Sequence, residues 1–383
     1  MRRVLVGLAM TAVTTAARAQ TTDHFYRSWT FAEEVVEARA AGLGGSAVAL
    51  EADAGTIAWN PAAAATVHHS EILAGGLSRG TRDGRLGDST ASRLGVGMVG
   101  GAGLVGRTLA IGGYLIEPHA QNWTLASSAL ADGSSDAGYL RTAVTEAAGA
   151  LAWRPTPMAS LGLAIGATHM EMEGAWTRTV NSVDDLRVGT SAGSTRITAV
   201  LGAMLMPSNV VTLGLSVTPG VTYAASRTAV SNTLGTLEAN GAYEVHRPLR
   251  VAAAVAWRPH RQVLVVAGAD YVRYSELSPA VRIGVGSSAD FAPSDAIEPR
   301  GGVELSLPAG ALSVQVRVGA HYEGRSGLSY SGGDALEQTV FAPQGGRFRP
   351  SCGASLVGRR ARLEIAGELS NRAVVTVTGG MTF

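Results

Sequence analysis

The stretch LSVQVRVGAHYE, residues 312–323, alternates apolar and polar side chains along its length. Because successive side chains of a strand point to opposite faces, this run predicts a β-strand with one apolar and one polar face. The runs 211–222 and 361–371 show the same alternation. In the run 312–323 the apolar face carries Leu312, Val314, Val316, Val318, Ala320 and Tyr322.

The length of these runs favours a membrane barrel over a soluble β-sandwich, which would bury the same apolar face inward. They extend over about ten to fifteen residues, whereas soluble strands have about five or six and a membrane-crossing strand needs about nine to eleven. We therefore predict an all-β fold, an antiparallel transmembrane β-barrel over residues 68–383. About fourteen strands are expected, an even number as bacterial outer-membrane barrels have, near 69–79, 93–104, 107–118, 139–153, 159–176, 193–206, 209–224, 243–257, 262–275, 297–307, 311–323, 347–358, 361–371 and 373–383.

The connections between the runs alternate between tight and long, as periplasmic turns and extracellular loops do in outer-membrane barrels. Tight turns are expected near 154–157, 207–209, 258–260, 308–310 and 358–360. Long loops rich in small polar residues are expected near 119–138, 177–192, 225–241, 276–296 and 324–346.

Aromatic residues stand near the ends of the predicted strands. Trp153 and Trp257 each belong to an Ala-Trp-Arg-Pro step at one end, and four tyrosines stand toward the other. Such placement is typical of the aromatic girdles at the two interfaces of a membrane barrel. The tyrosines are Tyr223, Tyr243, Tyr271 and Tyr322.

The last run, residues 373–383, ends on an aromatic residue, Phe383. Alternation places Val375, Val377 and Met381 on the same face as this residue. The pattern looks like the C-terminal signal by which outer-membrane barrels are recognised for insertion. An ordinary final edge strand is the alternative.

The beginning of the chain predicts export. Two arginines precede an apolar stretch at 4–13, and Ala17-Arg18-Ala19 forms a cleavage site, so residues 1–19 are interpreted as a signal peptide. Gln20 follows where a lipoprotein would have cysteine. No later run of about eighteen apolar residues predicts a membrane-spanning helix. We expect the protein in the bacterial outer membrane.

Composition excludes two classes of protein. The formal net charge of +1 gives no electrostatic case for a nucleic-acid partner. The single cysteine, Cys352, excludes an internal disulfide framework. Glycine, at 49 of 383 residues, exceeds the usual share of about 7%. Glycines inside β-branched runs suit strands that curve or approach another backbone closely.

Residues 20–67 precede the first predicted strand and form a separate unit. The run at 31–40 has the propensities of a short helix, and the glycine-rich stretch 42–65 follows it. A barrel of about fourteen strands encloses more space than its side chains fill, since such filling is typical of about eight strands. We therefore expect this segment to plug the lumen.

No motif predicts a catalytic, metal or cofactor site. The G-x-G-x-x-G match at 101–106 precedes residues of strand character, whereas a dinucleotide site needs a helix there, so we interpret it as a hairpin. The pair His68-His69 has no partners at metal-ligand spacing. A hydrolase whose triad assembles across space stays open as an alternative.

The polar faces of the predicted strands carry charges of both signs. Mixed signs suggest ion-paired packing inside a filled barrel rather than an ion filter of one sign, and a solvated wall is the alternative. These residues are Arg141, Glu146, Glu244, His246, Arg250, Asp270, Glu304, Arg317, His321, Arg347, Arg349, Arg362, Glu364 and Glu368.

Two prolines interrupt neighbouring predicted strands, at Pro219-Gly220 and at Pro248. Because proline has no N–H for the ladder, it is tolerated at edges or bulges. The pair therefore predicts either a lateral opening, as a seam between these two strands, or a plain bulge.

The segment 38–49, followed by EADAGTIAWNPA at 51–62, resembles the N-terminal signature of the FadL-like long-chain fatty-acid transport family. It equally resembles related barrels of protein export systems. The resemblance implies fourteen strands and a lumen plugged by the N-terminal segment. In uptake members it also implies that hydrophobic molecules pass through a pocket and leave sideways beside a kinked strand. The hatch residues that it assigns are Gly42, Gly44, Gly45, Asp53, Trp59, Asn60 and Pro61.

Three functional hypotheses follow. The first is an outer-membrane channel for hydrophobic small molecules, similar to long-chain fatty acids, whose N-terminal hatch blocks the lumen. The second is a non-transporting barrel that acts as a scaffold in protein export or surface assembly, and the third is an outer-membrane enzyme. Expected partners are outer-membrane lipids, a hydrophobic ligand whose binding residues stay unassigned, and the barrel assembly machinery.

Overall fold

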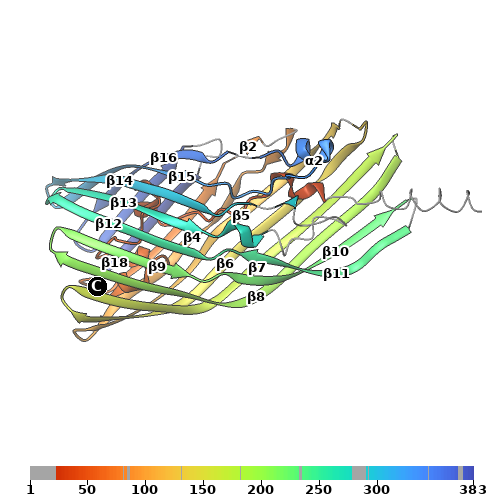
Figure 1. Ribbon diagram of the computed structural model, residues 1–383. Helices are drawn as coiled ribbons and strands as arrows, with labels where there is room; N and C mark the ends of the chain where they lie inside the picture. The colour runs from red at the N-terminus through yellow and green to blue at the C-terminus, as the bar shows by residue number, and fades with distance from the viewer. Residues whose placement is uncertain are drawn as a thin grey trace, which may run out of the picture.

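A computed structural model describes residues 23–80, 82–83, 87–130, 132–181, 183–232, 235–277, 290–291, 293–343, 345–369 and 374–383. The predicted signal peptide, residues 1–19, lies outside these residues. The described strands form one antiparallel sheet that closes on itself (Figure 1). No helix in this part of the chain is long and apolar enough to cross a membrane.

The sheet closes into a barrel because the last strand pairs with the first. Glu71 lies opposite Thr382, and Arg79 lies opposite Val374. The strands are β1 (Glu71–Arg79), β2 (Arg82–Asp83), β3 (Ser89–Thr90), β4 (Arg93–Val105), β5 (Leu109–Ala129), β6 (Ser135–Thr156), β7 (Ala159–Val180), β8 (Val183–Ser208), β9 (Val211–Thr218), β10 (Val221–Ser231), β11 (Gly235–Arg247), β12 (Arg250–His260), β13 (Val263–Val272), β14 (Ala296–Ala309), β15 (Leu312–Glu323), β16 (Arg347–Val357), β17 (Ala361–Glu368) and β18 (Val374–Thr382).

These eighteen segments make fourteen barrel strands. The short β2 and β3 lie in the connection from β1 to β4. The segments β9 and β10 are one strand interrupted at Pro219-Gly220, and β11 and β12 are one strand interrupted at Pro248-Leu249. The predicted fourteen-stranded antiparallel barrel is therefore confirmed.

Side chains alternate between an exposed exterior and a packed interior, as the sequence pattern predicts. In β18 the buried Thr376 and Thr378 alternate with apolar residues that point outward. An apolar exterior is what a strand needs where lipid surrounds it. The outward-facing residues at this end of the chain are Val375, Val377, Met381 and Phe383.

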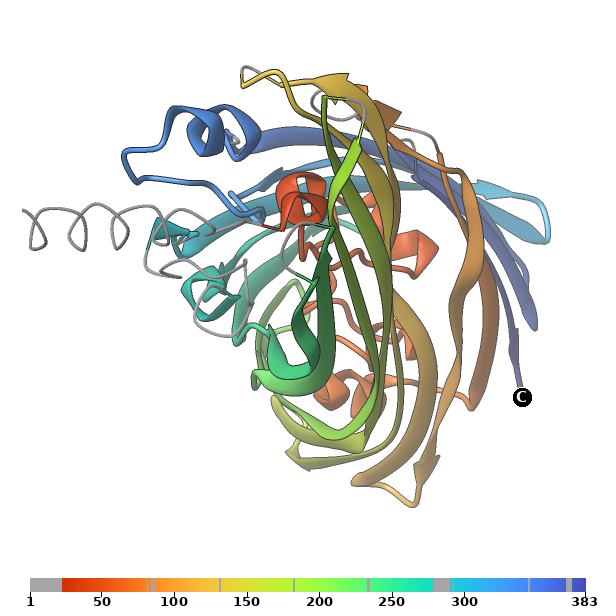
Figure 2. The ribbon, with the colours of Figure 1, turned by 90° about the vertical axis from the view of Figure 1, so that its right-hand side faces the viewer.

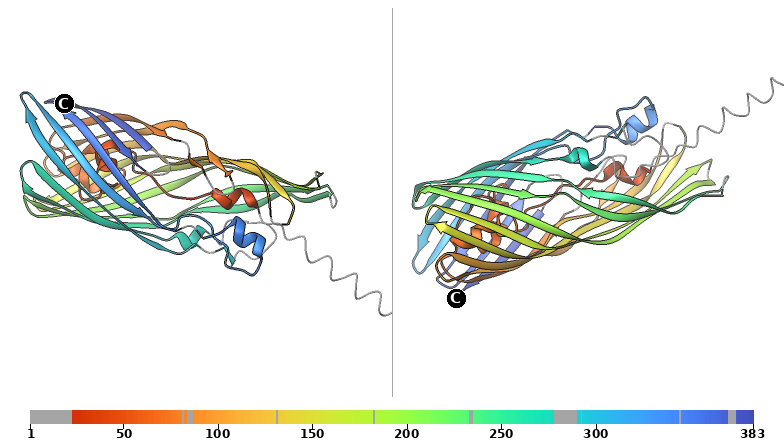
Figure 3. Two further views of the ribbon diagram at one scale, coloured as in Figure 1. Left: turned by 90° about the horizontal axis from the view of Figure 1, so that it is seen from above. Right: turned by 60° about the horizontal axis from the view of Figure 1, so that its bottom comes forward.

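The two ends of the barrel differ. The C-terminus and the tight connections lie at one end, here called the turn end (Figures 1 and 3), and the opposite end is called the loop end. Long connections at the loop end follow β13 and β15. The other expected long loops are wrong, because strands continue through most of 119–138, 177–192 and 225–241. Their Ser, Thr and Gly residues alternate with larger ones, which suits extended strands as well as loops.

Several side chains face the opposite side from the one expected. Arg141 and Glu244 are exposed on the outside, and His246 shares the outward phase of β11. Tyr223 and Tyr243 are buried in the lumen and belong to no girdle. Expected outward residues that are confirmed are Trp153, Trp257, Tyr271 and Tyr322.

Residues 23–67 lie inside the barrel (Figure 2). They form the short helices η2 (His24–Ser28), α1 (Ala38–Gly42), η3 (Ala54–Thr56) and η4 (Pro61–Thr66). The helix expected over 31–40 is wrong, because residues 31–36 have no regular secondary structure and α1 begins only after its cap, Glu37. Ion pairs with opposite parts of the wall, from Glu34 to Arg79 and from Glu33 to Arg247, hold this stretch.

The glycine motif at 101–106 is the predicted hairpin. It spans the end of β4 and the following turn, where Gly106 has a φ of 81°. No helix follows in the described chain before β5 begins at Leu109. The nucleotide interpretation is therefore excluded.

Candidate functional site: a plugged lumen with two breaks in its wall

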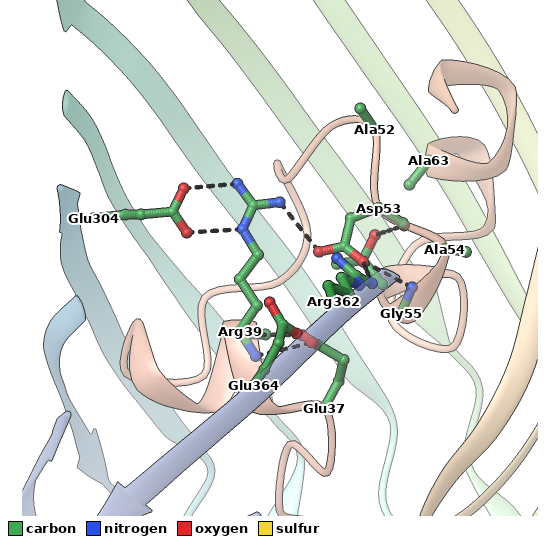
Figure 4. Close-up of polar contacts among 12 residues, drawn as sticks. Glu37, Arg39, Ala52, Asp53, Ala54, Gly55, Ala63, Glu304, Arg362 and Glu364 are labelled. Atoms are coloured by element: carbon green, nitrogen blue, oxygen red, sulfur yellow. Dashed lines mark hydrogen bonds and ion pairs between the residues drawn. The ribbon is translucent and has the colours of Figure 1, made fainter. Parts of the chain in front are cut away.

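A buried ion-pair cluster holds residues 37–66, here called the anchor, to the barrel (Figure 4). Asp53 accepts hydrogen bonds from Arg39 at 3.1 Å and from Arg362 of β17 at 2.8 Å. Its other contact is the backbone N–H of Gly55 at 2.9 Å. Burial by itself favours the neutral acid, but the two guanidinium groups hold the pKa of Asp53 well below its usual range.

Arg39 extends this cluster across the lumen. Its guanidinium donates two hydrogen bonds to Glu304 of β14, at 2.9 and 3.0 Å. Glu304 also accepts from the fully buried Arg317 of β15 at 2.6 Å. Arg317 in turn donates to Glu364 of β17 at 3.2 Å. The anchor and three strands therefore share one charge network, and loss of one member would leave an unpaired buried charge, at a cost of about 3–5 kcal/mol.

The cap of α1 adds a second carboxyl to the same region. Glu37 accepts the backbone N–H groups of Arg39 and Ala40, both at 2.8 Å. Burial raises the pKa of Glu37 well above its usual range, and the nearby charges of Asp53 and Glu364 act in the same direction. Figure 4 shows Glu37 and Glu364 side by side.

Glycines on the inner wall let the anchor backbone touch the strands. A Cβ at Gly202 of β8 would lie 2.0 Å from Oδ1 of Asn60, and one at Gly319 of β15 would lie 2.3 Å from the backbone nitrogen of Gly44. No side chain fits at such separations. We call these positions seat glycines, and the others are Gly162, Gly214 and Gly302.

All the residues that the resemblance assigns to a hatch lie in the anchor. Gly44 and Gly45 have φ values of 70° and 77°, which glycine adopts without strain. Asn60 caps η4 by accepting from the N–H of Ala62 at 3.1 Å, and its amide donates to the Val48 carbonyl at 2.6 Å. Of the remaining members, Gly42 is the last residue of α1 and Pro61 is the first residue of η4. Asp53 lies in the ion-pair cluster, and Trp59 borders a cavity.

Residues 23–36, here called the entry segment, fill the loop-end half of the lumen. Phe25, Tyr26, Trp29 and Phe31 are at most 1% exposed. They pack in one cluster with apolar residues of the wall, so the segment occupies the space that an apolar ligand would need. The space that these aromatic residues fill is here called the aromatic chamber. Its wall residues include Leu140, Val144, Met170, Met172, Trp176, Leu186, Val188, Tyr223 and Val245.

Buried ion pairs fasten the first residues of the entry segment. Arg227 of β10 donates two hydrogen bonds to Asp23, both at 2.6 Å. Arg27 donates to Asp88, between η2 and the β1–β4 connection, at 2.6 and 2.9 Å. Bidentate pairs of this kind fix orientation as well as charge.

His24 makes a further contact at the loop end. It hydrogen-bonds Asp136 of β6, and its other ring nitrogen lies 3.3 Å from Glu337 of α2 (Ala335–Val340). Burial disfavours the charged imidazole, but the two carboxylates outweigh burial and raise the pKa of His24. The contacts of the ring with both elements are therefore stronger when the ring is protonated.

The first break in the wall lies beside Pro219-Gly220. Pairing between β8 and β9 ends at Leu201 and Val217, and pairing with β10 resumes only at Ser191 and Ser226. Residues 192–200 of β8 therefore have no ladder partner on this side.

Pro248, the other proline that was expected to interrupt a strand, lies at the same level on the next strand. Across the two interruptions, Thr218 pairs with Arg250 and Val221 pairs with Arg247. Pro248-Leu249 thus stands opposite Pro219-Gly220, and pairing resumes directly on both sides. The structure brings the two prolines together, but the expected seam between their strands is wrong, because these strands pair on both sides of the prolines. The missing ladder lies instead between β8 and the strand that carries Pro219.

The second break in the wall lies at Pro118 of β5, a proline that the sequence analysis did not single out. Pairing between β4 and β5 stops at Met98 and Ile116. The carbonyl of Pro118 turns inward and accepts the N–H of Glu34 at 2.8 Å. A proline inside a strand-forming run was the available signal, as at Pro248.

Charged side chains fill the second break. Arg79 of β1, only 1% exposed, donates to Glu117 and to Glu34, each at 2.7 Å. Arg93 donates to the second oxygen of Glu117 at 2.8 Å. A network of ion pairs, buried at Arg79 and Glu117 and partly exposed at Arg93, therefore fills this part of the wall.

Adjacent residues of the entry segment reach both breaks. Glu34 pairs with Arg79 at the second break. Glu33 points the other way and pairs with Arg247 and Arg250, which flank Pro248 beside the first break. Opposite directions for neighbouring side chains require an extended backbone, which explains why this stretch is not helical.

Cavities border the anchor on more than one side. A small one lies on the inner side of the first break and is lined by Trp59, Val200, Thr218, Arg247 and Arg250, among others. A cavity of about 320 Å³ opens at the turn end. Charged and imidazole side chains line it, including Arg39, Glu51, His68, His69, Glu71, Arg258 and Arg362.

The described residues offer no metal site. His68 and His69 are exposed, and among the described ranges no group of three or more His, Cys, Asp or Glu side chains is placed to hold a metal ion. The lone thiol, Cys352, points outward.

Known proteins share the fold of this chain at low sequence identity. No protein-family model matches the sequence, and no curated protein matches it either. The toluene transporter TbuX of Ralstonia pickettii superimposes with a TM-score of 0.67 at 12% identity, covering 92% of this chain and 99% of its own. A FadL homologue of Pseudomonas aeruginosa gives 0.67 at 11%, covering 95% and 100%, and the toluene transporter TodX of P. putida gives 0.64 at 9%, covering 93% and 99%. The expected FadL-like fold is thus confirmed over nearly the whole chain.

Proposed function

We propose that this protein is a channel of the bacterial outer membrane for hydrophobic small molecules, with the N-terminal plug closing its lumen. One observation carries the proposal: the ladder is missing over residues 192–200 of β8, next to a lumen that the anchor blocks toward the turn end. The apolar exterior and the predicted signal peptide support the location. The fold shared with two toluene transporters supports the substrate class.

The route that fits this geometry runs sideways. A molecule would enter the aromatic chamber from the loop end as the entry segment gives way. The small cavity beside Trp59 and Thr218 then leads to the first break, where Pro219, Gly220 and Pro248 hold the wall open. The hatch residues from Gly42 to Pro61 block the direct path to the turn end. Long-chain fatty acids and aromatic hydrocarbons both belong to the class that such a path would pass.

Flux in proteoliposomes tests this function. The purified protein is reconstituted, and uptake of toluene and of a fluorescent fatty-acid analogue is compared with uptake of a sugar of similar size. We expect protein-dependent uptake of the hydrophobic probes and none of the sugar. Equal uptake in empty liposomes and proteoliposomes would refute a channel for hydrophobic molecules.

A scaffold in protein export or surface assembly is the second candidate. The observation that favours it is the fit of the anchor, which five seat glycines and a buried ion-pair network hold to the wall. A scaffold would co-purify with protein partners from cross-linked membranes and would show no flux. In either case we propose outer-membrane lipids as neighbours and the barrel assembly machinery as the partner that recognises Phe383.

A further inference from the structure

Arg196 stands in the unpaired part of β8. Its neighbours in phase, Ser194 and Thr198, are buried on the inner side of the wall. Alternation would place Arg196 inside as well, and its register partner on β7, Thr168, is fully buried. Arg196 is nevertheless exposed. Its side chain therefore passes through the first break and reaches the outer surface.

Side chains replace some of the missing ladder bonds there. The Nε–H of Arg196 donates to the carbonyl of Thr222 on β10 at 3.0 Å. The hydroxyl of Ser194 accepts the N–H of Ala224 at 3.2 Å. A second nitrogen of Arg196, Nη1, donates to the Thr195 carbonyl at 3.0 Å. Because a guanidinium group carries five N–H donors in a planar fork, donors remain for a ligand.

Arg196 also lacks a partner of opposite charge. The arginines inside the barrel pair with carboxylates, as Arg79 does with Glu117 and Arg317 does with Glu304. In the part of the chain that the structure describes, no carboxylate lies within ion-pair distance of Arg196. A cation at the edge of a membrane is stabilised by an anion, and the chain supplies none at this point.

The inner side of the break is lined by hydroxyl groups. Thr168 and Tyr223 hydrogen-bond each other at 2.8 Å, and the hydroxyl of Thr198 is buried without a partner among the described residues. A passage for bare hydrocarbon needs no such groups, whereas a polar head group would use them.

The height of Arg196 matches the edge of the hydrocarbon layer. On the turn-end side of it, Ile165 and Ile197 are 54% and 81% exposed. On the loop-end side, the outward residues at the same two strands are His169 and Thr195, which hydrogen-bond each other at 2.8 Å. Charged head groups lie at this level of a membrane, and arginine side chains reach toward it.

We propose that Arg196 binds the oxyanion head group of an amphiphile, a carboxylate or a phosphate, at the first break. The site therefore prefers anionic amphiphiles over neutral molecules with the same apolar body. The direction of movement rests on the proposed channel function, but the binding itself does not.

The test measures binding, so it is independent of flux. The full-length protein is placed in nanodiscs of zwitterionic lipid, and binding of a fluorescent long-chain carboxylate is compared with binding of its methyl ester. Arg196→Gln removes the charge, and Arg196→Lys keeps it. Arg141→Gln, an exposed arginine on the outside of β6 over Tyr139, is the matched control.

We expect the wild type to prefer the carboxylate, and Arg196→Gln to weaken carboxylate binding about tenfold with ester binding unchanged, since hydrogen bonds to charged groups are the stronger ones. Arg196→Lys should retain most of the preference and Arg141→Gln all of it. Equal affinity of the wild type for acid and ester would overturn the proposal, as would equal weakening of both probes by Arg196→Gln.

A second lipid mixture distinguishes the two possible sources of the head group, a membrane lipid and a free amphiphile. Adding a phosphate-rich anionic lipid should weaken carboxylate binding in the wild type and leave Arg196→Gln unaffected if a membrane phosphate occupies the site. No competition, with the carboxylate preference intact, assigns the site to a free amphiphile. Absence of flux in the wild type would defeat the channel function and leave the binding result standing.

Discussion

At the scale of single residues, the seat glycines decide how closely the anchor fits. A Cβ at Gly202 would lie 2.0 Å from Oδ1 of Asn60, whereas one at Gly193 of the same strand meets nothing within 4 Å. We therefore predict that Gly202→Ala destabilises the plugged barrel by about 1–3 kcal/mol, the usual cost of overpacking, and that Gly193→Ala has little effect. Unfolding in urea, followed by gel mobility, measures the difference. Equal urea midpoints for the two variants would contradict close contact between Gly202 and the anchor.

The charge of His24 makes the entry segment sensitive to pH. Because contacts with Asp136 and Glu337 raise the pKa of His24, its contribution to holding the segment is fully present below the unfolded value of about 6.5. That contribution is lost as pH rises through the folded pKa. We predict that proteolysis of the entry segment accelerates across this range and that His24→Gln flattens the profile. Faster cleavage in the wild type at pH 5.5 than at pH 8 would reverse the sign and refute this role.

At the scale of elements, the two breaks differ in what fills them. Buried ion pairs occupy the break at Pro118, whereas two hydrogen-bonding side chains cross the one at Pro219. We predict that Pro219→Val, which supplies a backbone donor, lowers uptake of a hydrophobic probe by proteoliposomes several-fold. Pro118→Val should change uptake little, because Arg79 and Glu117 still fill that break. Similar losses in both variants would show that neither break is the route.

Alternation predicts which segments are strands, because the two faces of a strand differ in polarity where it crosses the membrane. It does not predict where strands stop beyond the membrane, since β7 and β8 continue to Val180 and from Val183 through polar residues. Helix propensity fails at Glu33 and Glu34, where ion pairs across the lumen override it. The positions assigned to a hatch follow from the resemblance of the N-terminal segment and not from a local pattern. The sequence around Arg196 does not predict that this side chain points outward. Its direction depends on the missing ladder beside residues 192–200 of β8.

At the scale of the whole molecule, the plug consists of two parts held by different forces. The anchor is joined to β14, β15 and β17 by shared charges and to the wall by backbone contacts at the seat glycines. The entry segment is held by apolar packing in the aromatic chamber and by a few ion pairs at its ends. An apolar ligand of the proposed channel would compete with the second kind of contact and not with the first. We therefore infer that the entry segment moves and that the anchor stays.

Two deletions separate these parts in single-channel recordings. Removing residues 23–36 empties the aromatic chamber but leaves the anchor across the lumen, so we expect no ion conductance and a rise in hydrophobic uptake. Removing residues 23–66 also takes away the anchor. Because about fourteen strands enclose more than their side chains fill, we expect stable conductance in this variant. If the shorter deletion already conducts ions, the anchor does not close the lumen on its own, and a plug that moves as one body explains the data better.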